Sequence, residues 1–153
     1  MSMKNIAFVC TGNTCRSPMA ECITKHLLKV NNIDGFKVSS FGLTATNGES
    51  MNAFAYQVLC DYKIKYKTHK AKKLTDKLAK KQDYIFVMTD HQKQILSRYS
   101  NVFTIKEFVN AIEIPDPYGL GYKEYEAVFK VLFECCKRII SKLMERNNEN
   151  HNV

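Results

Sequence analysis

Residues 8–21 read FVCTGNTCRSPMAE and bring two cysteines, a glycine, an arginine and a Ser-Pro pair into one short stretch. They overlap the apolar run Asn5–Val9, which predicts a buried β-strand. Ser17 is a favourable N-cap and Pro18 suits the first helical position, so we expect a helix to begin there. The stretch therefore predicts a strand, a tight turn and a helix N-terminus in direct succession.

The turn has the composition of an anion-binding loop. The first amides of a helix have no partner inside the helix, and N–H groups that converge there can bind a tetrahedral dianion. Gly12 and Asn13 tolerate the backbone conformations that so tight a turn requires. The planar guanidinium of Arg16 can bind two phosphate oxygens. We expect a phosphate-binding loop made of Thr11, Gly12, Asn13, Thr14, Cys15 and Arg16.

Cys10 stands between the predicted strand and this loop. A thiol beside a helix N-terminus and a cation ionises readily, and the thiolate is the nucleophilic form. We expect Cys10 to attack phosphorus in line and form a phosphocysteine, with the Ser17 hydroxyl donating to the sulfur. The spacing C-x5-R is weak evidence by itself. The alternative of a merely buried Cys10 leaves the coincidence of strand, glycine, arginine and helix start unexplained.

A candidate acid lies far downstream, in the loop Ile114–Gly121, which contains two of the three prolines. Pro115 and Pro117 restrict the backbone around Asp116, and a well-placed general acid typically contributes roughly a hundredfold to ten-thousandfold in rate. An aspartate before a proline is also a common turn residue. We interpret Asp116 as the proton donor because a nucleophile loop accompanies it.

Strand-like and helix-like segments alternate along the rest of the chain. This alternation predicts an α/β fold, in which right-handed crossovers join the strands of a four-stranded parallel sheet with helices on both faces. Such sheets bind ligands at the carboxyl ends of their strands, where the opening stretch lies. The expected further strands are Phe36–Ser40, Tyr84–Met88 and Val102–Thr104, and the expected further helices are Ala53–Asp61, one capped by Thr75, Asp90–Tyr99 and Tyr122–Glu145.

Length and composition are those of one soluble globular domain spanning residues 1–153, with 45% hydrophobic and 25% charged residues. The polar tail 147–153 is expected to be disordered. No apolar run is long enough for a membrane span and no signal peptide is recognisable, so we expect a cytoplasmic protein. The six scattered cysteines indicate reduced thiols without zinc-ligand spacing, and we expect no metal and no cofactor.

The net charge is +8, and nine lysines fall between Lys63 and Lys81. Such a stretch can bind nucleic acid, but no nucleic-acid motif accompanies it. We therefore favour a solvated basic face whose field attracts phosphorylated substrates. We expect a monomer that acts on phosphorylated proteins, releases inorganic phosphate and has no membrane or nucleic-acid partner.

The chain resembles the low-molecular-weight protein tyrosine phosphatases over nearly its whole length. The resemblance implies a four-stranded parallel sheet and a set of roles: Cys10 as nucleophile, Arg16 as phosphate clamp, Ser17 as support of the thiolate, and Asp116 as acid and later base. The matching motifs are Cys10–Arg16 followed by Ser17-Pro18, Val38–Ser40 with Gly42, His69–Leu74, Tyr84–Thr89 and Asp116-Pro117-Tyr118.

Other positions match the family's supporting residues. Asn13, Ser40 and His69 correspond to a hydrogen-bond network that holds the loop in shape, and Tyr118 corresponds to an aromatic wall of the substrate pocket. The chain departs from many relatives at Phe41, where a small residue is common. A single tyrosine follows the Asp-Pro pair, where some members have two.

Thr14 bears on the substrate. Members that act on phosphotyrosine commonly have an aliphatic residue here, whereas the branch that resembles bacterial protein-arginine phosphatases has threonine, and Val102–Val109 also resembles that branch. A hydroxyl in the pocket suits a guanidinium, whereas a larger apolar side chain favours an aromatic ring. We favour phosphoarginine over phosphotyrosine, with the alternative that Thr14 is only a permissive loop residue.

Two other functions fit parts of the pattern. A thiol-dependent arsenate reductase has a similar anion loop, but this chain has no cysteine between Cys60 and Cys135 to carry electrons. A non-catalytic phosphate-binding module would not need the nucleophile and the acid together. Cys15 adds a redox hypothesis, because a second thiol in the loop could form a reversible disulfide with an oxidised Cys10.

Overall fold

The computed structural model describes residues 3–66 and 68–151. Its centre is a parallel sheet of four strands in the order β2-β1-β3-β4. The predicted α/β class and the four-stranded parallel sheet are confirmed. The strands are β1 (Lys4–Cys10), β2 (Phe36–Gly42), β3 (Tyr84–Val87) and β4 (Val102–Thr104).

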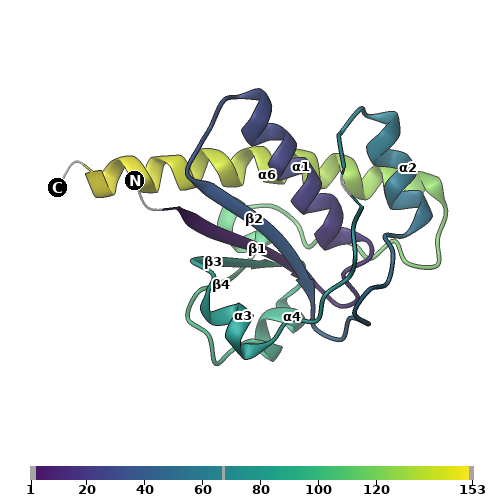
Figure 1. Ribbon diagram of the computed structural model, residues 1–153, viewed down its shortest axis with the longest axis horizontal. Coiled ribbons are helices and arrows are strands. Elements are labelled where there is room, and N and C mark those ends of the chain that lie inside the picture. The colour runs from purple at the N-terminus through teal and green to yellow at the C-terminus, as the bar shows by residue number, and fades with distance from the viewer. Residues whose placement is uncertain (1–2, 67, 152–153) are drawn as a thin grey trace.

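Helices cover both faces of the sheet, as the alternation predicts. In Figure 1, α1, α2 and the long α6 lie on one side of the strands, and α3 and α4 lie on the other. The helices are α1 (Arg16–Val30), α2 (Ala53–Asp61), α3 (Asp76–Lys80), α4 (Asp90–Ile95), α5 (Ile105–Val109) and α6 (Tyr122–His151).

Strand β1 is buried on both faces and sets the direction of Cys10. Ile6, Phe8 and Cys10 belong to the larger hydrophobic cluster, which includes residues of α1, α2, α5 and α6. Ala7 and Val9 point the other way, into the smaller cluster with residues of α3. Side chains alternate along a strand, so the register that buries Phe8 also turns the Cys10 sulfur toward α1.

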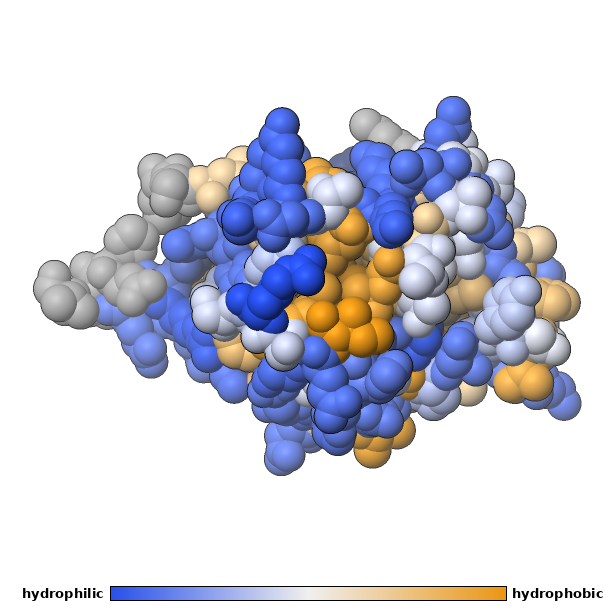
Figure 2. All heavy atoms as spheres, turned by 90° about the horizontal axis from the view of Figure 1, so that it is seen from below, coloured by the Kyte–Doolittle hydropathy of each residue, from blue (hydrophilic) through white to orange (hydrophobic). Residues whose placement is uncertain are grey.

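The smaller cluster is covered only by short elements. Figure 2 shows the molecule from below the view of Figure 1, the side of α3 and α4, and hydrophobic side chains gather in the middle of this face. Partly buried side chains pack there against the cluster, namely Leu43, Leu74, Leu78 and Tyr99. The thicker part of the core therefore lies on the α1 and α6 side of the sheet.

The start of α1 corrects one prediction. The helix begins at Arg16, with Cys15 as an N-cap that makes no side-chain capping bond, so Ser17 and Pro18 are its second and third residues. Pro18 is tolerated because the first amides of a helix have no acceptor within it. Ser17 is not the cap because its hydroxyl lies 2.9 Å from the sulfur of Cys10.

Other helices also differ from expectation. Helix α6 runs through residues 147–151, where we expect disorder, because neither glycine nor proline interrupts the segment; residues 152–153 lie outside the described residues. Helix α4 ends at Ile95, short of Tyr99. Helix α5 is not predicted, although its capping box of Thr104 and Glu107 follows a recognisable sequence pattern. Within the described residues, no helix combines the length and the apolar character that crossing a membrane requires.

Gly42 generates a stability prediction because a Cβ there would meet Ala45 Cβ at 2.7 Å, Thr11 O at 2.8 Å and Asn13 N at 2.9 Å. We expect Gly42→Ala to lower the free energy of unfolding by about 1–3 kcal/mol, because backbone atoms of the loop must move. Urea unfolding measures the change. Gly121→Ala is the control, because its Cβ would meet only a flexible glutamate oxygen, at 3.4 Å. Equal stability of both variants would contradict the close packing.

Buried thiols predict a loss of stability at alkaline pH. Burial raises the pKa of Cys136 from its ordinary value of 9.0 to about 12. Between these two values only the unfolded chain releases this proton, so the free energy of unfolding falls as pH rises.

Between about pH 8 and pH 9.5, we expect Cys136→Ala to remove about 1 kcal/mol of the decrease in the free energy of unfolding. Urea unfolding in the presence of a reductant measures this change. Cys60→Ala, at an exposed cysteine, is the control and leaves the decrease unchanged. An unaltered decrease in Cys136→Ala would refute the assignment.

Candidate active site

A cavity of about 250 Å³ opens at the carboxyl end of β1. It brings together the predicted nucleophile, the predicted phosphate clamp and the predicted acid, although about a hundred residues separate the first from the last. Glu49 also lines the cavity, and no sequence motif indicated it. The lining residues are Cys10, Thr11, Gly12, Thr14, Cys15, Arg16, Glu49, Asp116 and Tyr118.

Four backbone carbonyls of the loop accept hydrogen bonds from outside the cavity. The donors belong to the segments that follow β2 or precede α2 and α3. The bonds are Leu43 N–H to Cys10 O (2.9 Å), Thr44 N–H to Thr11 O (3.0 Å), His69 Nε2 to Asn13 O (2.7 Å) and Asn52 N–H to Thr14 O (2.9 Å). A carbonyl can only accept, so Nε2 of His69 carries the proton in its bond.

The amides of the same loop are left free. In residues 3–66 and 68–151, no hydrogen-bond acceptor is found for the backbone N–H of residues 11–15. The first turn of α1 adds its unpaired amides and the positive end of the helix dipole. A loop with its carbonyls bound outside and its amides free has the polarity that binds an anion.

Asn13 holds this loop from within. It is fully buried and has a φ of 58°, a left-handed conformation that asparagine tolerates. Its Oδ1 accepts from the backbone N–H of Lys72 at 3.0 Å, which identifies the opposite atom as the amide nitrogen. That Nδ2 donates to Ser17 Oγ at 2.8 Å and to Ser40 Oγ at 3.0 Å. The predicted network of Asn13, Ser40 and His69 is therefore present in the geometry.

Glu21 completes the network from α1. Ser40 Oγ donates to its Oε1 at 2.6 Å, so the Ser40 oxygen is free to accept from Asn13. The Glu21 carboxylate therefore determines the direction of the Ser40 hydroxyl.

Ser17 connects this hydrogen-bond network to Cys10, the predicted nucleophile. The Asn13 amide can only donate to the Ser17 oxygen, so the Ser17 proton is left for another acceptor. Cys10 Sγ lies 2.9 Å from Ser17 Oγ, and the carbonyl of Phe41 lies at 3.4 Å. The shorter contact favours donation to the sulfur, as expected for a group that supports a thiolate.

Arg16 is almost fully buried, and the loop after α5 positions it. Its Nη1 donates to the carbonyl of Ile114 at 3.1 Å, and its Nη2 lies 3.5 Å from Asp116 Oδ2. The Asp116 side chain is 56% exposed and also accepts from the Tyr118 N–H at 3.1 Å. Tyr118 is exposed at the mouth of the cavity. The predicted acid thus lies at the entrance, and the predicted clamp lies at the base.

Comparison with known proteins agrees with this geometry. The family model described as low molecular weight phosphotyrosine protein phosphatase matches residues 5–150. The chain belongs to this family.

Several relatives of this low-molecular-weight phosphatase are named for their activity. A protein-arginine-phosphatase of Bacillus subtilis (strain 168) is 33% identical over 146 residues, which cover 91% of this chain and 96% of that protein. The tyrosine phosphatase PtpB of Staphylococcus haemolyticus is 36% identical over 132 residues, covering 83% and 91%. The crystal structure of a YwlE mutant from Bacillus subtilis has a TM-score of 0.86 at 31% identity, covering 92% and 99%.

These similarities confirm the predicted family and the predicted enzyme class. The chain is a cysteine-based phosphatase of the family that includes protein tyrosine and protein arginine phosphatases. The relatives named above are phosphatases rather than arsenate reductases, so the reductase alternative gains no support from them.

Cys15 lies on the buried side of the phosphatase loop. Its sulfur lies 3.2 Å from the hydroxyl of Tyr125, a fully buried residue of α6. Burial raises the pKa of the Cys15 thiol, although the bond to Tyr125 opposes this effect. Burial also raises the pKa of Tyr125. We therefore expect Cys15 to remain a neutral thiol at neutral pH.

Gln92 is a second support that sequence reasoning missed. It is buried at the start of α4, and its Oε1 accepts from the backbone N–H of Met88 at 2.8 Å and of Thr89 at 3.2 Å. Its Nε2 donates to Thr11 Oγ1 at 3.3 Å. The carboxyl end of β3 is thereby connected to the first residue of the loop.

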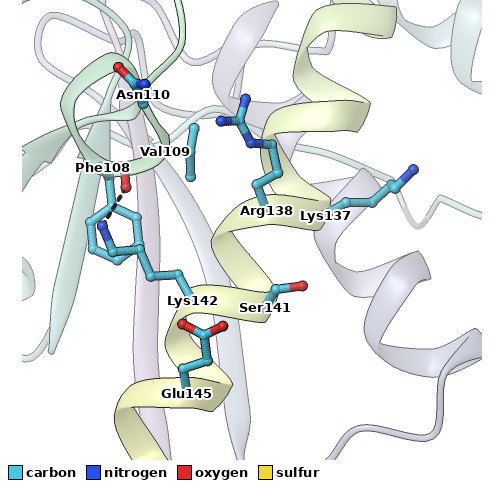
Figure 3. A pocket seen from close by; sticks show the side chains of 8 residues that line it. All are labelled: Phe108, Val109, Asn110, Lys137, Arg138, Ser141, Lys142 and Glu145. Atoms are coloured by element: carbon cyan, nitrogen blue, oxygen red, sulfur yellow. Dashed lines mark hydrogen bonds between the residues drawn. The ribbon is translucent and has the colours of Figure 1, made fainter.

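A larger cavity, of about 480 Å³, lies between the end of α5 and α6. Figure 3 shows that charged side chains of α6 surround it, and that Lys142 reaches the carbonyl of Phe108. This bond, at 2.8 Å, neutralises the carboxyl end of α5. The cavity contains no cysteine among its lining residues, so its size does not make it the phosphatase site.

Proposed function

We propose that this phosphatase hydrolyses phosphorylated protein side chains through a phosphocysteine on Cys10. One observation carries the proposal: a loop with free amides surrounds the cavity that Cys10 and Arg16 line. Oriented N–H groups stabilise the charge of a transferring phosphoryl group without reorganising. The buried guanidinium of Arg16 adds fixed positive charge at the same place.

In the first step, the Cys10 thiolate attacks phosphorus. The S–P bond forms as the bond from phosphorus to the leaving atom breaks. Asp116, at the entrance of the cavity, gives its proton to the leaving oxygen or nitrogen. The amides of residues 11–15 and Arg16 hold the phosphoryl oxygens during the transfer.

In the second step, water attacks the phosphocysteine. The Asp116 carboxylate takes the proton of the water, the P–O bond forms and the S–P bond breaks. The Ser17 hydroxyl, 2.9 Å from the sulfur, stabilises the departing thiolate. Inorganic phosphate leaves, and Cys10 and Asp116 return to their starting protonation states.

Phosphoarginine is the substrate that we favour. Thr14 lines the cavity, so its side chain contributes a hydroxyl where an aliphatic residue would present an apolar wall. A hydroxyl can hydrogen-bond a guanidinium, and its apolar replacement would favour an aromatic ring. The similarity to a protein-arginine-phosphatase supports this choice, and the similarity to tyrosine phosphatases keeps phosphotyrosine as the alternative.

We also propose Cys15 as a redox partner of Cys10. Both cysteines are free and line the same cavity. A peroxide would oxidise Cys10 to a sulfenic acid and be reduced in turn, and the Cys15 thiol would then displace water from that sulfenic acid to form a disulfide. The disulfide would protect Cys10 from irreversible oxidation.

The catalytic assignment is tested with two aryl phosphates. We expect Cys10→Ser to abolish hydrolysis of both p-nitrophenyl phosphate and phenyl phosphate. Asp116→Asn lowers kcat by roughly a hundredfold to ten-thousandfold on phenyl phosphate, and less on p-nitrophenyl phosphate, whose leaving group needs no proton. Steady-state kinetics measure both, with Cys60→Ser as the control. Full turnover by Cys10→Ser would refute the mechanism.

The substrate assignment is tested by the ratio of kcat/KM on a phosphoarginine peptide to that on a matched phosphotyrosine peptide. We expect the wild type to prefer phosphoarginine, and Thr14→Ile to shift the ratio toward phosphotyrosine by roughly tenfold or more, because the hydroxyl is lost and the wall becomes apolar. Thr14→Ser retains the hydroxyl and is the matched control. A wild type that prefers phosphotyrosine, or an unchanged ratio in Thr14→Ile, would rule out phosphoarginine specificity through Thr14.

A further inference from the structure

Glu49 contributes a carboxylate to the active-site cavity that the proposed chemistry does not use. It lines the cavity with Cys10, Thr14 and Arg16, but the residue itself belongs to the loop after β2 and is exposed. Asp116, the other carboxylate of the lining, already pairs with Arg16 at 3.5 Å. The cavity therefore has one acidic side chain in excess of those that the mechanism needs.

The backbone holds Glu49 in place. Its N–H donates to the carbonyl of Thr46 at 3.2 Å, and its carbonyl accepts from Ala71 N–H at 2.8 Å. Three residues later, Asn52 N–H donates to the carbonyl of Thr14 at 2.9 Å. The carboxylate is thus attached to a segment that hydrogen-bonds directly to the phosphate loop.

The carboxylate of Glu49 makes no hydrogen bond or ion pair within residues 3–66 and 68–151, although the chain has a net charge of +8. An unpaired negative charge beside a loop that binds a dianion repels a substrate whose only charged group is its phosphate. The same charge would attract a substrate that also carries a cation near its phosphate. The interaction of Glu49 with a substrate would therefore depend on the charge that surrounds the phosphoryl group.

We propose that Glu49 selects substrates that carry a positive charge close to the phosphoryl group. The inference rests on the proposed function, and it narrows the substrate class of the same site. Two sources have this chemistry: the guanidinium of phosphoarginine itself, or a lysine or arginine beside a phosphotyrosine. A guanidinium pairs with a carboxylate through two parallel hydrogen bonds, so Glu49 suits either source.

The test compares four substrates: p-nitrophenyl phosphate, a phosphoarginine peptide with neutral neighbours, and phosphotyrosine peptides with either lysine or glutamine neighbours. The variants are Glu49→Gln, which removes only the charge, and Glu49→Lys, which reverses it. Glu145→Lys is the matched control, because Glu145 is an exposed glutamate beside the separate cavity of α6. Values of kcat and KM are measured at low and at high salt.

We expect Glu49→Gln to lower kcat/KM on the cationic substrates by about two- to fivefold, mainly through KM, and Glu49→Lys to lower it further. High salt reduces these effects. Hydrolysis of p-nitrophenyl phosphate and of the glutamine-flanked peptide improves, because the negative charge that disfavours a lone phosphate is gone. A loss on the phosphoarginine peptide supports its guanidinium as the cation, and a loss confined to the lysine-flanked peptide supports the neighbouring residue.

Equal effects of the Glu49 variants on all four substrates, or effects equal to those of Glu145→Lys, would overturn the inference. Failure of the proposed function is a separate result. In that case the wild type itself would show no hydrolysis of p-nitrophenyl phosphate that depends on Cys10. If wild-type turnover is normal and Glu49→Lys does not discriminate, only the role of Glu49 is wrong.

Discussion

The site depends on the outward direction of four loop carbonyls, those of Cys10, Thr11, Asn13 and Thr14. A short loop can bind an anion only if its amides face inward, and its carbonyls must then find donors elsewhere. Here the donors come from the segments after β2, before α2 and before α3, so three separate parts of the chain hold one loop. Gly42 permits this arrangement, because any Cβ there would meet the backbone of the loop. The anion site is therefore a property of the whole edge of the sheet.

The buried polar network determines the direction of the hydrogen bonds at the site as well as the shape of the loop. The Lys72 N–H orients the amide of Asn13 from one side, and the Glu21 carboxylate orients the Ser40 hydroxyl from the other. With both of these groups oriented, the Ser17 proton is left for the sulfur of Cys10, the nearer of its two possible acceptors. A buried network whose donors all have acceptors is rigid, whereas a half-satisfied network would cost stability. These hydrogen-bond directions favour donation from Ser17 to the sulfur.

Sequence reasoning succeeded where the signal is local. Neighbouring residues determine both the alternation of strands and helices and the loop from Cys10 to Arg16. The fold class can be predicted from these local signals. It misplaced the start of α1 because Ser17 has the chemistry of a cap, whereas the fold uses its hydroxyl for a sulfur seven residues earlier. Glu49, Gln92 and Tyr125 reach the loop from remote segments. No spacing rule relates such residues to the loop, because only the packing of the sheet brings them together.

The placement of charge at the site follows from the same packing. Arg16, the cation that we propose to bind phosphate, is buried, where its position is fixed and its field is screened little by water. The carboxylates of Asp116 and Glu49 remain at the entrance, where solvent weakens their repulsion of the dianion. A carboxylate at the base would cancel the attraction of the amides. An acid for the leaving group can therefore come only from the rim, and the rim is also where neighbouring charge on a substrate can be recognised.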